Sequence, residues 1–150
     1  MIEANGDELL TTSLRPHLIF GPRDNHLLPS LLDKARQSRI PQIGNGTNKV
    51  DLTYVEDAAR AHILAADALA PASPVAGGIY FISQDEPVIL WQWIQELLRQ
   101  LDLPPVRIRI PLGIARAAGS LLATAYRGLS LRGEPPLTPF LASELAQNHY

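Results

Sequence analysis

The stretch IGNGTNKVDLTYVEDAARAHILAADAL, residues 43–69, decides the fold of this chain. It opens with the glycine-rich turn 44–46 and continues with apolar residues at every second position between residues 50 and 54. A period of two is typical of a strand with one buried face. A helix of small apolar residues follows, and Asp57 is its predicted N-cap, because a carboxylate there accepts hydrogen bonds from free amides. The order of strand and then helix indicates an α/β protein.

Similar segments lie on both sides of this stretch. Further strands are predicted at residues 9–14, 17–20, 79–82 and 106–110. Further helices are predicted at residues 27–39, between residues 87 and 104, and at residues 112–127 and 138–147. Strands that alternate with helices favour βα units with at least partly parallel pairing. We expect residues 1–150 to form a single unit with an α/β fold.

Composition excludes several classes of function. The chain has 13 Lys and Arg against 15 Asp and Glu, for a net charge of -2, so it lacks the basic surface that nucleic acids require. It has no cysteine, which excludes disulfides, thiolate zinc sites and thiol chemistry. Residues 117–126 are uncharged but fall short of the ~20 that a bilayer-spanning helix needs. A peripheral membrane contact by residues 110–129 stays open, although their Gly and Ala content favours a close-packed helix.

Local motifs do not by themselves identify a reaction. The sequence holds no P-loop, serine nucleophile elbow or paired-histidine zinc motif, and its four histidines are too dispersed to predict a metal site. The glycines at 44–46 precede a strand, whereas a phosphate-binding loop precedes a helix. Arg107 and Arg109 alternate along one strand, which favours a solvated face over an anion site. The residues alone therefore predict only an α/β domain without a signal for secretion, which we expect to be cytoplasmic.

Three segments together resemble a known family. They are LRPHLIFGPRDNHLLPSLLDKARQ (14–37), IGNGTNKVDLTYVEDAARAHILAADAL (43–69) and GGIYFISQDEPV (77–88). Their combination is similar to the second half of an extended short-chain dehydrogenase/reductase. Within that superfamily it most resembles the 3β-hydroxysteroid dehydrogenases, particularly the decarboxylating sterol-4α-carboxylate 3-dehydrogenases. The resemblance is good over about residues 9–111 and looser beyond them.

The resemblance implies a partial enzyme. The family folds as a Rossmann-like, doubly wound sheet that binds NAD or NADP in its first half, and the second half builds the substrate-binding part. Its catalytic Tyr-x-x-x-Lys pair lies in the first half, and no such pair occurs in these 150 residues. We therefore expect a truncated gene product or an excised piece that does not catalyse hydride transfer alone.

The resemblance also implies site residues. Pro16, His17 and Leu18 correspond to the strand end that runs beside the nicotinamide ring, where open backbone groups after the proline fix the carboxamide. Residues 21–28 correspond to the substrate entrance. The substrate-binding residues expected there are Arg23, Asp24, Leu27 and Leu28.

One position bears on the substrate. Related sugar-nucleotide epimerases and dehydratases carry an arginine just before the aspartate of this motif, where it pairs with the substrate diphosphate. This chain has Val50 there, which removes a strong anion contact and favours an apolar, sterol-like alcohol. An epimerase or dehydratase fragment and a non-catalytic binding module remain the alternatives. Because the central strands would be missing, we also expect the chain to self-associate through an exposed sheet edge.

Overall fold

The computed structural model describes residues 4–25, 27–131, 133 and 135–150, together with the backbone but not the side chain of Leu27. Its contacts divide the chain into two compact units. The first comprises Met1–Asn25 and Asp51–Pro87, and the second comprises His26–Val50 and Val88–Tyr150. Each unit is therefore assembled from two separate stretches of sequence, and each is described by itself.

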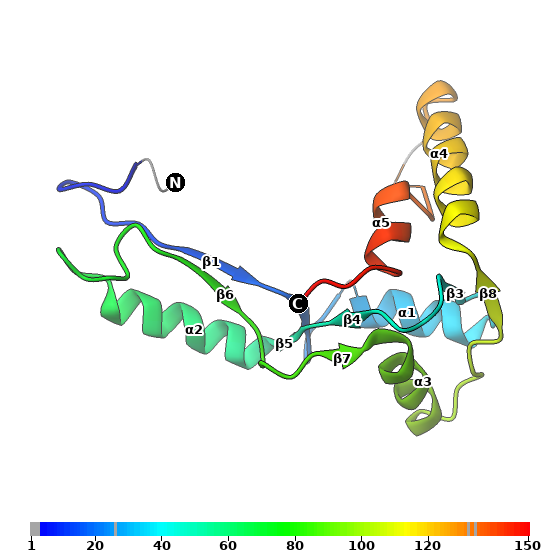
Figure 1. The fold of residues 1–150 in the computed structure, drawn as a ribbon, viewed down its shortest axis with the longest axis horizontal. Helices are drawn as coiled ribbons and strands as arrows, with labels where there is room; N and C mark the ends of the chain where they lie inside the picture. The colour runs from blue at the N-terminus through cyan, green and yellow to red at the C-terminus, as the bar shows by residue number, and fades with distance from the viewer. Residues whose placement is uncertain (1–3, 26, 132, 134) are drawn as a thin grey trace. The chain divides into compact units, whose positions relative to one another are not determined.

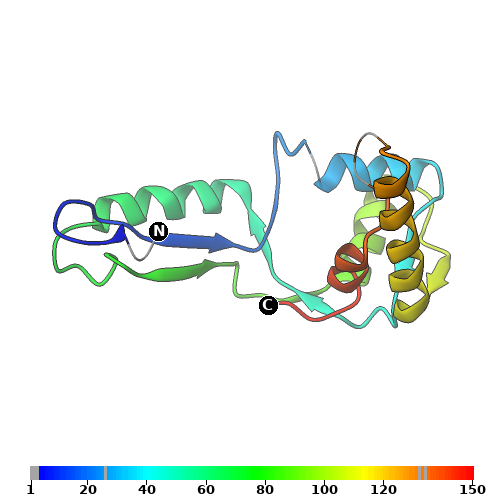
Figure 2. The same cartoon turned by 90° about the horizontal axis from the view of Figure 1, so that it is seen from above.

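The first unit consists of parallel strands and one long helix. Strand β1 (Ser13–Pro16) pairs in parallel with β6 (Ile79–Ile82), and β2 (Leu18–Phe20) pairs in parallel with β5 (Leu52–Tyr54). Helix α2 (Val55–Ala68) runs alongside these strands (Figures 1 and 2). Strand β5 leads directly into α2, so this unit holds the βα step predicted from the alternating residues 50–54.

Strand β6 is poorly covered. Its residues Ile79, Tyr80 and Phe81 are 44%, 38% and 67% exposed. Consecutive strand residues point to opposite faces, so apolar side chains are exposed on both faces of the strand. Parallel pairs are normally buried on both faces. The first unit therefore presents apolar surface that a complete sheet of this kind would cover.

The second unit has its own apolar core. Strand β3 (Pro41–Ile43) pairs in parallel with β8 (Ile108–Ile110), and β4 (Lys49–Val50) pairs antiparallel with β7 (Val88–Ile89). Its helices are α1 (Leu27–Arg36), α3 (Leu90–Gln100), α4 (Leu112–Gly128) and α5 (Pro139–Glu144). The buried apolar residues of this unit are Ala35, Ile40, Ile43, Val50, Leu90, Trp91, Ile94, Leu98, Ala115 and Ala142. Four of them recur at helical spacing along α3, which makes this helix the centre of the core.

Small residues let α4 and α5 pack closely. Gly119 is buried, and a Cβ built on it would lie 2.8 Å from the backbone of Thr138 and Pro139. The outward positions Ile114 and Leu121 are 61% and 74% exposed. Residues 112–128 thus form a helix that packs closely on α5 at Gly119, while most of its other residues are exposed. Among the helices of the described residues, none combines the length and apolarity that crossing a bilayer requires.

Several predicted boundaries were wrong. The strand predicted at 9–14 begins only at Ser13 and runs through Pro16. The alternating segment 50–54 is two short strands, because Val50 pairs with Val88 whereas Leu52 pairs with Leu18. Helices end earlier than predicted at Arg36 and Glu144, and the strand predicted at 106–110 begins only at Ile108.

Asp57 is not the N-cap of α2. The N-cap position is Tyr54, which makes no side-chain capping bond, because the strand β5 runs into the helix without a turn. Asp57 lies within the first helical turn, where its negative charge interacts favourably with the positive end of the helix dipole and so stabilises the helix. Its Oδ2 atom accepts a hydrogen bond from Gln84 Nε2 at 3.2 Å.

Candidate functional site

The expected cofactor segment lies where the chain changes its strand partner. Pro16 ends β1, His17 follows, and Leu18 begins β2. The N–H of His17 donates to the carbonyl of Ile82 at 3.1 Å, and the Thr53 hydroxyl donates to the same carbonyl at 2.9 Å. Proline at this point has no N–H to place in the ladder, which suits the end of a pairing. The Ile82 carbonyl therefore ties the segment to both β5 and β6.

This hydrogen bond bears on the expected cofactor contact. The N–H of His17 is engaged within the sheet, whereas the resemblance implied open backbone groups at His17 and Leu18. The three residues themselves are half-buried. The His17 ring lies 6.3 Å from the Phe81 ring, and the Arg15 guanidinium lies over the same ring at 5.8 Å. The side-chain surroundings of the segment are thus cationic and aromatic.

A buried carboxylate lies beside this segment. Asp51 is the residue before β5, and His17 is the residue before β2. Because Leu52 and Leu18 are register partners in this parallel pair, Asp51 lies next to His17. Asp51 is only 6% exposed, and its Oδ1 atom is buried without a hydrogen-bond partner. A buried polar atom that lacks a partner is uncommon in folded proteins and calls for an explanation. A donor from outside the described residues would satisfy it.

The turn after β2 needs glycine. Gly21 has φ 140°, and a Cβ there would lie 2.7 Å from Val55 Cγ1 and 2.9 Å from the Tyr54 ring. The N–H of Asp24 closes the turn by donating to the Gly21 carbonyl at 3.1 Å, and Arg23 adopts φ 67°. The turn holds Arg23 exposed and Asp24 half-buried.

The expected site residues do not all fall in one unit. Pro16, His17, Leu18, Arg23 and Asp24 belong to the first unit. Leu27 and Leu28 belong to the second, where they begin α1. The side chain of Leu27 lies outside the described residues, and Leu28 is half-buried. Five of the seven expected site residues thus lie in the first unit, and the other two lie at the start of α1 in the second unit.

The residues present include possible contacts for only one end of a dinucleotide. Pro16 lies at the carboxyl end of β1, the end of a parallel strand at which α/β proteins bind ligands, and the Oδ1 atom of Asp51 is a buried acceptor without a partner. A diphosphate needs a glycine-rich turn that opens a helix, and the sequence contains none.

Solved structures share this fold. The chain superimposes on an epimerase, Mth375 of Methanothermobacter thermautotrophicus, with a TM-score of 0.54 at 18% identity, over 69% of this chain and 32% of that one. It matches DesIV, a dTDP-glucose 4,6-dehydratase of Streptomyces venezuelae with NAD bound, with a TM-score of 0.50 at 22% identity, over 65% of this chain and 30% of that one. The fold is therefore part of the Rossmann-like α/β fold of epimerases and dehydratases.

The sequence defines the family more narrowly. The chain belongs to the 3-beta hydroxysteroid dehydrogenase/isomerase family, whose model matches residues 1–112. It is 44% identical, over all of its length, to a 2-alkyl-3-oxoalkanoate reductase of Stenotrophomonas maltophilia, covering 46% of that protein. It is 35% identical to the decarboxylating sterol-4-alpha-carboxylate 3-dehydrogenase of Mus musculus, again over its full length and 43% of that protein. The chain thus spans less than half the length of these relatives. The predicted superfamily and family are confirmed.

One candidate region was missed by the sequence analysis. A cleft in the second unit is lined by residues of β3, α3 and β8, including Gln42, Trp91 and Arg109. The only signal for it in the sequence was the pair Arg107 and Arg109, whose alternation along one strand favoured a solvated face. Gln42 gave no signal, because a single glutamine in a short apolar run does not indicate a buried polar group.

Proposed function

We propose that this chain is the substrate-binding, C-terminal portion of an NAD(P)-dependent oxidoreductase that interconverts a secondary alcohol and a ketone on an apolar substrate. The reacting carbon is β to a carboxylate. The 3β-hydroxysterol acids are one class of such substrates, and 2-alkyl-3-hydroxy acids are the open-chain class.

The names of two relatives support this chemistry. A 2-alkyl-3-oxoalkanoate carries its ketone at C3, two bonds from the carboxylate carbon, and an alkyl substituent on the carbon between. A sterol-4-alpha-carboxylate 3-dehydrogenase acts at C3, beside the ring carbon that bears the carboxylate. The two substrates differ in shape but share a carboxylate, a branched α-carbon and an oxygen on the β-carbon. The chemical groups that the two substrates share therefore include the carbon at which the reaction takes place.

The proposed class of substrate rests mainly on the apolar residue Val50. It is fully buried, with 0% exposure, and pairs with Val88 in β4 and β7. An arginine in the corresponding position is the diphosphate contact of the sugar-nucleotide enzymes that the motif resembles. An apolar side chain at this position supplies no such contact, which disfavours an epimerase or dehydratase acting on nucleotide sugars.

The proposed roles divide between this chain and an upstream half. A bound nicotinamide supplies the hydride acceptor or donor. The segment Pro16, His17 and Leu18 orients the ring from the strand end, and Arg23, Asp24, Leu27 and Leu28 line the substrate entrance. The carboxylate of Asp51 accepts a hydrogen bond from a donor of the upstream half or of its ligand. The Tyr-x-x-x-Lys pair is not in these 150 residues, so the chain alone is inactive.

A chimera tests the proposal. The upstream half of the Stenotrophomonas maltophilia reductase is joined to this chain, and NAD(P)H oxidation or NAD(P)⁺ reduction is followed with four substrates. These are a 2-alkyl-3-oxo acid, a 3β-hydroxysterol bearing a 4α-carboxylate, the same sterol without the carboxylate, and a UDP-sugar. We expect turnover of at least one carboxylate substrate and little of the others. Turnover of the UDP-sugar alone would overturn the substrate class.

Two controls keep the result interpretable. Cooperative unfolding and NADH binding by the chimera establish that it is folded, so an inactive but folded chimera contradicts the proposal. NADH is also titrated into the chain alone, where we expect no tight binding. Tight binding by the chain alone would favour a binding module that is complete without the upstream half.

A further inference from the structure

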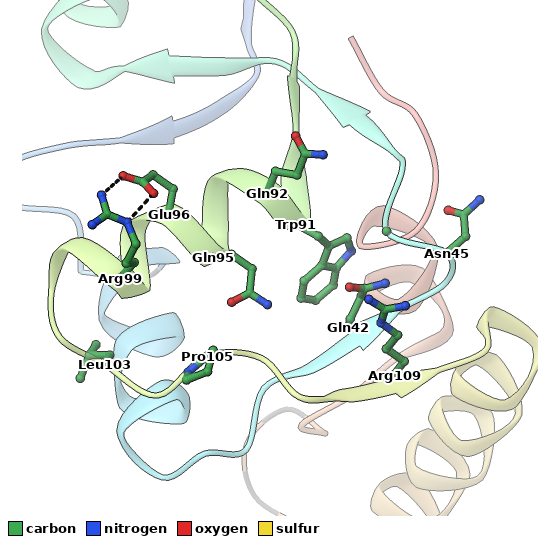
Figure 3. Close-up of a pocket in the computed structure, with 11 residues that line it drawn as sticks. Gln42, Asn45, Trp91, Gln92, Gln95, Glu96, Arg99, Leu103, Pro105 and Arg109 are labelled. Atoms are coloured by element: carbon green, nitrogen blue, oxygen red, sulfur yellow. Dashed lines mark hydrogen bonds and ion pairs between the residues drawn. The ribbon is translucent and has the colours of Figure 1, made fainter.

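The second unit contains a cleft outside the expected cofactor and substrate segments. It has a volume of about 660 Å³ and lies between α3 and the β3–β8 pair (Figure 3). Small-molecule sites occupy ~300–1,000 Å³, so this cleft has the size for a small organic ligand. Its lining comes from the turn after β3, from one side of α3 and from the segment that leads into β8.

The side chain of Gln95 positions the segment that forms one wall of the cleft. Its Nε2 donates to the carbonyl of Val106 at 3.1 Å, and its Oε1 accepts from the N–H of Val106 at 3.3 Å. Both hydrogen-bonding groups of this side chain are thereby used on backbone. The segment carrying Leu103 and Pro105 is fixed at a set distance from α3, so the cleft between them is built by specific contacts.

The buried amide of Gln42 and the guanidinium of Arg109 lie side by side at the other end of the cleft. Gln42 and Arg109 are register partners on the parallel strands β3 and β8, and Figure 3 shows the carboxamide of Gln42 beside the guanidinium of Arg109. Gln42 is only 8% exposed. Within the described part of the chain, its Nε2 makes one hydrogen bond, a long one of 3.5 Å to the Gly44 carbonyl. Gly46 leaves room for this amide, because a Cβ there would overlap it.

The charge of the cleft is not balanced. Glu96 and Arg99 form an ion pair of 2.6 Å and neutralise each other. No carboxylate of the described residues lies within ion-pair distance of Arg109. The Trp91 indole N–H is already used on the Leu145 carbonyl, so this side chain offers the cleft only apolar surface. The cleft therefore has the exposed guanidinium of Arg109 and the buried amide of Gln42 at one end, beside Trp91. Leu103 and Pro105 lie toward the other end, next to the Glu96–Arg99 ion pair.

We propose that this cleft binds a small organic carboxylate with an apolar body, and that Arg109 is its counter-ion. The carboxylate pairs with the Arg109 guanidinium, and the Gln42 Nε2 donates to it. The apolar body extends past Trp91 toward Leu103 and Pro105. This second site needs neither a nicotinamide nor the upstream half, so it does not depend on the oxidoreductase proposal.

Calorimetry with octanoate on the full chain tests the site. We expect saturable binding with one site per chain, and a shift of the Trp91 indole resonance in NMR spectra at the same concentrations. Octan-1-ol, which has the same chain without the charge, is expected to bind at least about tenfold more weakly, because a charge-assisted hydrogen bond is lost. Absence of saturable octanoate binding, or equal binding of octanol, would overturn the proposal.

A matched pair of variants locates the charge. Arg109→Gln is expected to weaken octanoate binding about tenfold or more, whereas Arg107→Gln leaves it within about twofold. Arg107 lies two residues away and is exposed like Arg109, but it does not line the cleft. Arg109→Lys, which keeps the charge but loses the bidentate geometry, is expected to fall between the two. Equal weakening by both glutamine variants would mean general attraction of anions and would reject the site.

Discussion

The indole Nε1 of Trp91 donates a hydrogen bond to the backbone carbonyl of Leu145, 2.9 Å away. Trp91 is 3% exposed and belongs to the core face of α3, whereas Leu145 caps the end of α5. A single side chain therefore joins the central helix of the second unit to a segment 54 residues later in the sequence. The same indole forms an apolar wall of the cleft, so stability and the shape of the cleft are linked.

Trp91→Phe is expected to lower the free energy of unfolding by about 1–3 kcal/mol, because it removes a buried donor and part of a large apolar side chain. Urea denaturation followed by circular dichroism measures the change. Gln92→Ala is the control, since its side chain is exposed on the same helix, and it should change stability by less than about 0.5 kcal/mol. Equal stability of Trp91→Phe and the parent would mean that the hydrogen bond contributes nothing.

Two glycines of α4 offer opposite predictions. Gly119→Ala places a methyl group 2.8 Å from the backbone of Thr138 and Pro139, so α5 must move away, at a cost of about 1–3 kcal/mol. Gly113→Ala meets nothing within 4 Å and is expected to stabilise the helix by up to about 1 kcal/mol. Thermal unfolding of the two variants provides the comparison. A loss of stability at Gly113 as large as that at Gly119 would contradict the close approach of α4 and α5.

The sequence predicted the elements better than their ends. Periodicity located α3, whose apolar residues recur on one buried face, whereas α2 and α4 were located by their content of small residues. It failed at Asp57, since capping preference assumes a turn before the helix, whereas β5 enters α2 directly. It also failed to divide the strand at residues 50–54, because the pairing of Val50 with Val88 depends on residues far away in sequence.

The candidate sites were accessible from sequence to different degrees. The segment Pro16, His17 and Leu18 came from a motif, and only the coordinates showed that the His17 N–H is used within the sheet. The cleft was not predictable, because Gln42 and Arg109 are neighbours only through the parallel register of β3 and β8. No local pattern reports which strands pair.

The carboxyl group of Glu96 is expected to titrate far below its ordinary range. Hydrogen bonds from Arg99, and then from Gln100, lower its pKa from 4.5 to about 2. Because the pKa is depressed in the folded state, the stabilisation is present above about pH 4.5 and is lost as the pH falls toward 2. Carbon-detected NMR of the Glu96 carboxyl measures the midpoint.

Variants of the two exposed ion pairs test the cause of this shift. Arg99→Gln should return the Glu96 midpoint toward 4.5, because the guanidinium is the largest contribution. Arg36→Gln, which breaks the ion pair with Asp33, should leave it unchanged. A midpoint near 4.5 in the parent chain would show that the ion pair is not populated in solution. The ion pair is exposed, so the global stability of the chain should change little.

The exposed strand β6 makes the isolated chain prone to association. Phe81 and Ile79 are 67% and 44% exposed, and β6 pairs only with β1 among the described strands. An apolar strand with a free edge is a template for pairing with another chain. We therefore expect dimers or larger species in light scattering, and Phe81→Lys should shift them toward monomer. Phe140→Lys is the matched control, because Phe140 is 73% exposed but lies on helix α5 of the other unit and not on a strand. A monodisperse parent monomer would contradict the predicted association, and equal effects of both variants would mean that it does not depend on β6. If an upstream half covers β6 in the chimera, light scattering should show a smaller fraction of dimers and larger species for the chimera than for the chain alone.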